Sequence, residues 1–151
     1  MSATAHQQLS DALLARLLSP PALAFGRVYA NRFMPLPQGR VSMVVLRRDQ
    51  TALRTSVLGG PLNWTSTYAV ECYGRGTAGE DPAGFVDDLL AQVWARLFGL
   101  TPADLPGLGV MDIAADRAID WQFDEAETPM ACATVRFSVH HRTTADLEPR
   151  S

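Results

Sequence analysis

The sequence predicts an α+β (α/β) domain, in which a long helix and a short N-terminal helix pack on a mostly antiparallel or mixed β-sheet. Residues 119–125 and 130–141 alternate apolar and polar side chains, with the period of two that a strand with one buried face requires. Residues 80–98 instead repeat apolar side chains every three or four positions, which is the period of an amphipathic helix. A wide apolar helix face must pack on another layer, and a half-buried sheet supplies one.

The first half of the chain is expected to hold one helix and three strands. Leu9, Leu13 and Leu17 form one apolar stripe, and Ser19-Pro20-Pro21 ends that helix because proline has no N–H to donate. The expected elements are a helix over 6–18 and strands over 25–33, 41–46 and 63–73. The stretch 49–62 stays open between a polar strand and a loop that contacts a neighbouring protein.

The second half is expected to hold the long helix and a β-hairpin. Pro82 suits the first position of the helix over 80–98, and Gly99 ends it. A short strand over 110–113 is expected before the hairpin, which runs from about 118 to 142, and the polar tail after about residue 143 is expected to fray. The order α-β-β-β-α-β-β fits a single domain over residues 1–151.

Composition excludes several classes of protein. The chain has 151 residues, of which 47% are hydrophobic and 19% charged, which favours a globular domain over a disordered segment. No run is long and apolar enough for a membrane span, and no signal peptide is expected at the N-terminus. Cys72 and Cys132 are expected to be free thiols in strands, although a disulfide between neighbouring strands stays open.

Charge is divided unevenly along the chain. Residues 1–75 hold eight Arg against three acids, a net charge of +5, whereas residues 76–151 hold five Arg against thirteen acids, a net charge of −8. We interpret this as a subunit whose basic side meets the acidic side of its neighbour, with a solvated mixed surface as the alternative. The candidate interface residues are Arg32, Arg40, Arg47, Arg48, Arg54, Asp112, Asp116, Asp124, Glu125 and Glu127.

No catalytic, cofactor-binding or metal-binding residues are predicted, and the chain is not expected to be an enzyme. Gly74 to Gly79 has the form G-x-G-x-x-G between a strand and a helix, which is the context of a dinucleotide loop. Glu80 and Asp81 follow at once and would repel a pyrophosphate. Ser138, His140 and Asp120 could be drawn as a catalytic triple, but any domain of this size offers such a set. Direct nucleic-acid contact is not favoured, since the pI is about 5.5.

Several segments together resemble a known family. They are the arginine-bearing stretch with a proline turn from Arg32 to Val45, V-E-C-Y at Val70–Tyr73, D-D-L-L-A-Q-V-W-A-R-L-F at Asp87–Phe98, D-W-Q-F-D-E at Asp120–Glu125 and A-T-V-R-F-S-V-H-H-R-T at Ala133–Thr143. In these segments the chain resembles the tail terminator proteins of long-tailed phages, the minor tail proteins of the lambda type. The resemblance covers most of residues 6–147, and it rests on the order of the elements and on the residue patterns within them.

The resemblance implies a structural virion assembly protein without enzyme activity or cofactor. It implies a homo-oligomeric ring, expected to be a hexamer, that caps the tail tube protein, stops tube growth and offers a surface to the head–tail connector protein. Its place would be the tail–neck junction of the virion, after synthesis in the host cytoplasm. Two alternatives stay open: another phage neck or tail component, such as a head–tail joining or tail tube protein, and a nucleotide-binding domain that uses the Gly74–Gly79 loop.

Overall fold

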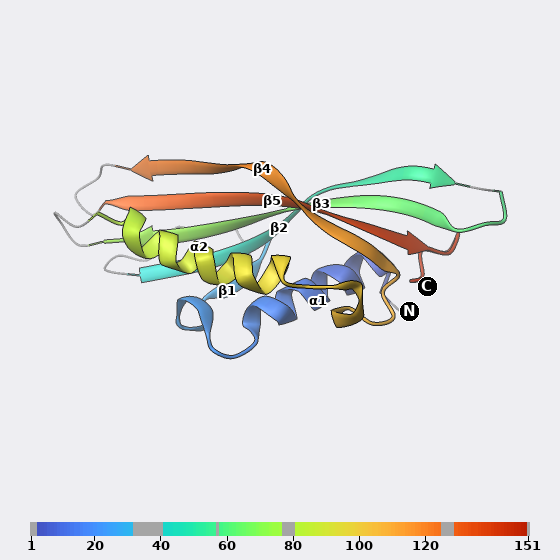
Figure 1. The fold of residues 1–151 in the computed structure, drawn as a ribbon, viewed down its shortest axis with the longest axis horizontal. Coiled ribbons are helices and arrows are strands. Elements are labelled where there is room, and N and C mark those ends of the chain that lie inside the picture. Colours follow the sequence, from blue (N-terminus) through green and yellow to red (C-terminus); the bar gives the residue numbers. More distant parts are fainter. Residues whose placement is uncertain (1–2, 32–40, 57, 77–80, 125–128, 151) are drawn as a thin grey trace.

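In the described part of the chain, five strands form one mixed sheet, and two α-helices lie on one face of it (Figure 1). The computed structural model describes residues 3–31, 41–56, 58–76, 81–124 and 129–150. The strand order is β1-β2-β3-β5-β4; β1 runs parallel to β2, and the other neighbours are antiparallel. The elements are α1 (Ala5–Leu18), η1 (Leu23–Gly26), β1 (Val28–Ala30), β2 (Val41–Ser56), β3 (Leu62–Arg75), α2 (Ala83–Phe98), η2 (Pro102–Asp104), β4 (Val110–Asp124) and β5 (Met130–Thr143).

The predicted α+β class, the mixed sheet and the order of helices and strands are confirmed, but the long helix is wrong. Helix α2 has 16 residues and is hardly longer than α1, which has 14. The described helix begins at Ala83, after Pro82, and the Ala83 N–H donates a hydrogen bond of 3.0 Å to Asp81 Oδ1. That carboxylate satisfies one of the backbone donors that a helix start leaves free. The helix therefore begins after Asp81, later than the predicted start at residue 80.

Strands β2 and β4 are longer than predicted, and residues 49–56 of the open stretch at 49–62 belong to a strand. Strand β2 continues to Ser56 and pairs with β3 along its whole length. The pairing register shifts twice, between Arg48 and Gln50 and between Leu53 and Thr55. Strand β4 is continuous through the expected break between 113 and 118, because a register shift between Ala115 and Ile119 accommodates those residues. The expected strand over 25–33 is reduced to β1 and the short helix η1.

The core lies between the helices and the inner face of the sheet. Leu9, Leu13 and Leu17 of α1 are fully buried, as the predicted stripe requires, and pack in one cluster with inward residues such as Val70 and Val135. Apolar burial of this kind contributes about 1.5–3 kcal/mol for each large side chain. Within the core, the Tyr68 hydroxyl and Ser10 Oγ share a hydrogen bond of 2.9 Å that joins α1 to β3.

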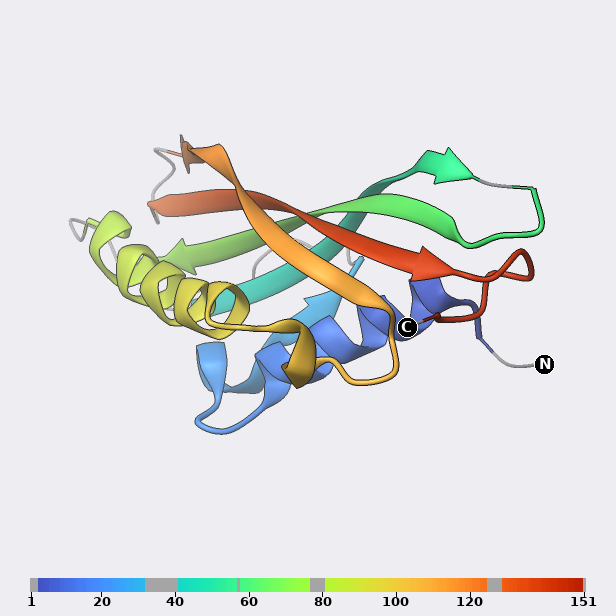
Figure 2. The same cartoon turned by 45° about the vertical axis from the view of Figure 1, so that its right-hand side comes forward.

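The start of α1 and the segment that follows β5 lie side by side (Figure 2). The Ala5 N–H donates to the Leu147 carbonyl at 2.7 Å, and the Arg150 N–H donates to the Arg142 carbonyl at 3.1 Å. A bridge between Thr143 and Pro149 completes this return of the chain. The tail, for which the sequence predicts fraying, is therefore folded back against β5 and the start of α1 in this structure.

The two cysteines are free, and both are buried. Cys72 pairs with Ala133 across β3 and β5, whereas Cys132 pairs with Tyr73. Because side chains alternate between the faces of a sheet, Cys72 points to the helices and Cys132 to the other face, so the two cannot form a disulfide. Burial raises the pKa of the Cys72 thiol to about 12, and the nearby Cys132 and Glu71 add to the shift.

Gly74 is required by the close packing of α2 on β3. A Cβ atom built there would lie 2.4 Å from Phe85 Cε2 and 2.5 Å from Val86 Cγ2. We expect Gly74→Val to lower the free energy of unfolding by about 1–3 kcal/mol, because overpacking forces neighbouring side chains out of position. Urea unfolding followed by circular dichroism measures the loss. Gly84→Val is the matched control for new bulk, since a Cβ at Gly84 meets nothing within 4 Å; equal losses in both variants would contradict the packing explanation.

Candidate interaction surfaces

The basic and acidic candidate residues lie toward opposite sides of the sheet. Arg47, Arg48 and Arg54 are on β2, whereas the acidic candidates Asp112, Asp116 and Asp124 are on β4, with β3 and β5 between them. Strand β1 pairs with β2 only up to Leu46, so the part of β2 that carries the basic residues forms an edge among the described strands. The remaining candidates, Arg32, Arg40, Glu125 and Glu127, lie outside the described residues.

Several of these charges already have partners in their own chain. Arg47 forms an ion pair with Glu71, and Arg48 donates a hydrogen bond to Gln7 of α1. Asp112 pairs with His140 on the adjacent strand, and Asp120, which was not among the interface candidates, pairs with Arg136. These contacts depend on cross-strand register, which the sequence does not reveal. Arg54, by contrast, is exposed on the β2–β3 hairpin.

The sheet face opposite the helices is polar along its centre. Its residues enclose a shallow pocket of about 270 Å³. The pocket is lined by Arg47, Arg48, Asp49, Ala69, Glu71, Gln122, Thr134 and Arg136. The Tyr73 hydroxyl donates to Glu71 at 2.7 Å, and burial, followed by this hydrogen bond, raises the pKa of the hydroxyl. Toward β1 the same face becomes apolar, where Met43 and Val45 are buried beside Tyr29 and Tyr73.

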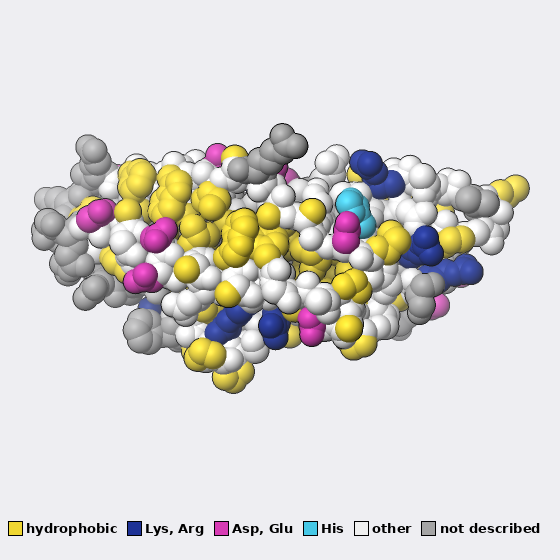
Figure 3. Space-filling model, viewed as in Figure 1, with side chains coloured by type: hydrophobic (Ala, Val, Ile, Leu, Met, Phe, Trp, Pro, Cys, Tyr) yellow, Lys and Arg dark blue, Asp and Glu magenta, His cyan; other side chains and the backbone are white. Residues whose placement is uncertain are grey.

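An apolar groove lies between α2 and the edge strand β4. It has a volume of about 220 Å³ and is lined by Asp87, Leu90, Ala91, Trp94 and Ile119. Trp94 keeps 37% of its surface exposed and Ile119 keeps 38%, because the sheet covers only part of the apolar face of α2. Figure 3 shows hydrophobic side chains gathered over this part of the molecule. Large apolar side chains left exposed together are typical of a contact surface for another protein.

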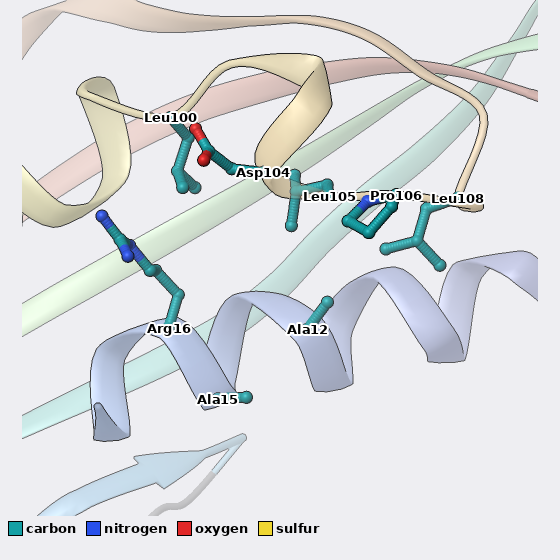
Figure 4. Close-up of a pocket in the computed structure, with 8 residues that line it drawn as sticks. All are labelled: Ala12, Ala15, Arg16, Leu100, Asp104, Leu105, Pro106 and Leu108. Carbon is teal, nitrogen blue, oxygen red and sulfur yellow. The ribbon is translucent and has the colours of Figure 1, made fainter.

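A second cleft, of about 450 Å³, separates α1 from the loop that carries η2 (Figure 4). Its walls are mostly apolar, with Arg16 and Asp104 as the charged residues. Asp104 accepts hydrogen bonds from the Thr101 N–H at 2.8 Å and the Thr101 hydroxyl at 3.1 Å, which lower the pKa of its carboxyl group. Arg16 Nε donates to the Arg96 carbonyl at 3.3 Å. The hydrogen bonds of Arg16 and Asp104 therefore stabilise the helices and the η2 loop, and the two charged groups do not converge on the cleft.

A cluster of polar and aromatic side chains is buried where α1 meets β3 and β5. His141 has no exposed surface, and its Nε2 lies 2.8 Å from Ser66 Oγ. The His6 ring lies edge-on to the rings of Trp64, at 4.8 Å, and His141, at 5.2 Å. Burial, then the nearby His6 and His140, lowers the pKa of His141 to about 4. This cluster was not predicted from the sequence, although His141 continues the apolar face of the alternating run that ends at Val139.

The described residues do not assemble the chemical sites considered from the sequence. His140 is hydrogen-bonded to Asp112, and Asp120 is hydrogen-bonded to Arg136. The triple of Ser138, His140 and Asp120 is therefore not formed. Within the described ranges, no group of three or more His, Cys, Asp or Glu side chains could hold a metal ion. Gly74 is explained by its packing against α2, and Gly79 lies outside the described residues.

Comparison with known proteins does not assign a family. No family model matches the sequence, and no curated protein matches it. Among the described helices, none is both long enough and apolar enough to cross a membrane. The function must therefore be argued from the fold, the surfaces and the resemblance in the sequence.

Proposed function

We propose that this chain is a structural subunit of a long-tailed phage particle, a tail terminator that assembles into a homo-oligomeric ring. The ring, expected to be a hexamer, caps the tail tube protein, stops tube growth and offers a surface to the head–tail connector. This places the protein at the tail–neck junction of the virion, with no enzymatic role. The sequence segments that resemble this family and the α+β fold that the resemblance implies support the proposal.

The observation that carries the proposal is the placement of opposite charges on opposite sides of one sheet. Arg54 lies on the exposed part of β2, and Asp112 and Asp116 lie on β4, the last strand on the other side. A subunit with different surfaces at its two sides makes head-to-tail contacts, which close into a ring when the rotation between neighbours allows it. A ring of such subunits has two different ends, one for the tube and one for the connector.

Deleting the gene from the phage or prophage that carries it tests this function. We expect tails of uncontrolled length that are not attached to heads, because tube growth then lacks its stop and its joining surface. Electron microscopy of the particles gives the tail lengths, and supplying the intact gene from a plasmid should restore them. Filled heads beside free tails of normal length would instead indicate the alternative neck-joining role, and unaltered particles would exclude both assembly roles.

A further inference from the structure

The β2–β3 hairpin carries an apolar tip that its own chain does not cover. At its turn the hairpin extends past the two helices, as the right-hand end of Figure 1 shows. Leu58, in the turn, is fully exposed, and Leu53 keeps 48% of its surface exposed. We refer to the described residues 49–56 and 58–62 as the arm. Its described side chains are mostly exposed, and Arg54 is its one basic residue.

The α2–β4 groove has the complementary properties. Its floor is apolar, with Leu90, Ala91 and Ile119, and its rim carries Asp87. Asp88, the next residue on α2, is also exposed. An arm that placed Leu58 in this groove would bury two exposed apolar surfaces together and bring Arg54 toward carboxylates. Burial of apolar surface drives such a contact, and the opposite charges favour the correct orientation.

The arm cannot reach the groove of its own chain. The turn of the arm lies at one end of the molecule, and α2 lies over the other half of the sheet (Figure 1). A contact between arm and groove must therefore join two copies of the chain. Each copy would give its arm to one neighbour and its groove to the other, which is the heterologous arrangement that generates rings.

We propose that the α2–β4 groove is the docking site for the arm of a second copy of this chain, with Leu58 as the anchor and Arg54 facing Asp87. This inference rests on the proposed ring and deepens it, because it names the surfaces through which neighbouring subunits bind. The contact is directional, since the two surfaces differ in shape and charge.

Two complementary variants test the contact. Leu58→Asp disables the arm and leaves the groove intact, whereas Ala91→Glu disables the groove and leaves the arm intact; both positions are exposed, so the fold is retained. In sedimentation velocity, the wild-type chain is expected to associate, and each variant alone is expected to stay monomeric, with at least about tenfold weaker association. An equimolar mixture is expected to form a one-to-one dimer, because one intact arm and one intact groove remain.

Ala103→Glu, at an exposed position of η2 outside the groove, is the control for added negative charge and should associate like the wild type. Association of either disabled variant at wild-type strength would overturn the proposal, as would the absence of a dimer in the mixture or a wild-type chain that is monomeric at millimolar concentration. The assay contains no tail tube, so its failure differs from failure of the proposed function, which the tail lengths of the deletion report. Normal tail length control by Leu58→Asp would overturn the arm contact alone.

Discussion

Phe137→Ala is expected to lower the free energy of unfolding by about 3–5 kcal/mol, which is the range for removing a buried phenylalanine ring. Phe137 keeps only 1% of its surface exposed. Its ring stacks on Tyr68 of β3, with centroids 5.4 Å apart and planes 15° apart. The same ring also packs against the Phe98 ring of α2, which lies edge-on at 5.8 Å. The substitution therefore removes the ring that connects the sheet to α2.

Guanidinium unfolding of both chains, followed by circular dichroism, measures this loss. Phe123→Ala is the matched control, because the Phe123 ring keeps 59% of its surface exposed and the same atoms are removed with little change in burial. We expect that control to stay within about 1 kcal/mol of the wild type. A loss below about 1.5 kcal/mol for Phe137→Ala would show that the ring does not hold α2 on the sheet.

The faces of the elements could be predicted from the sequence, because they depend on local periodicity. The residues assigned to the inward face of the last run, Ala131, Ala133, Val135, Phe137 and Val139, are all buried. The arm could not be predicted in this way. Residues 49–56 are largely exposed, so no buried face imposes an alternation of apolar side chains. Their strand character comes from pairing with β3, which is a contact between segments that the local pattern does not encode.

The candidate charges within the described residues lie on β2 and β4, but their partners depend on register. Glu71 meets Arg47 because Val45 pairs with Glu71 and Arg47 with Ala69, one step along the same face. The sequence contains both charged residues, but it does not show the strand register that brings them together. The apolar groove has a similar origin: the pattern of α2 predicts a wide face, but only the position of β4 determines that Trp94 stays partly exposed.

Buried His141 predicts a loss of stability in acid. A histidine in the unfolded chain has a pKa of about 6.5, whereas burial holds the pKa of folded His141 at about 4. Between these values the unfolded chain binds a proton that the folded chain does not, so stability decreases as the pH falls. The contribution is fully present above pH 6.5 and is lost progressively toward pH 4, a total of about 3 kcal/mol. Burial, then the charge of Arg48, also lowers the pKa of His6, so His6 acts in the same direction.

Chemical unfolding at a series of pH values from 8 to 4 measures this dependence. His141→Gln removes the titrating group and leaves an amide that extends as far as the imidazole Nε2 and can still hydrogen-bond Ser66. We therefore expect the free energy of unfolding to fall less steeply between pH 6.5 and 4 in this variant. The difference arises because the neutral imidazole is enclosed beside His6 and Trp64, where a charge cannot be hydrated. The same pH slope in the variant and the wild type would contradict this assignment and would place the acid sensitivity in other groups. A reduced slope would assign the acid-induced loss of stability to His141, at the junction of α1, β3 and β5.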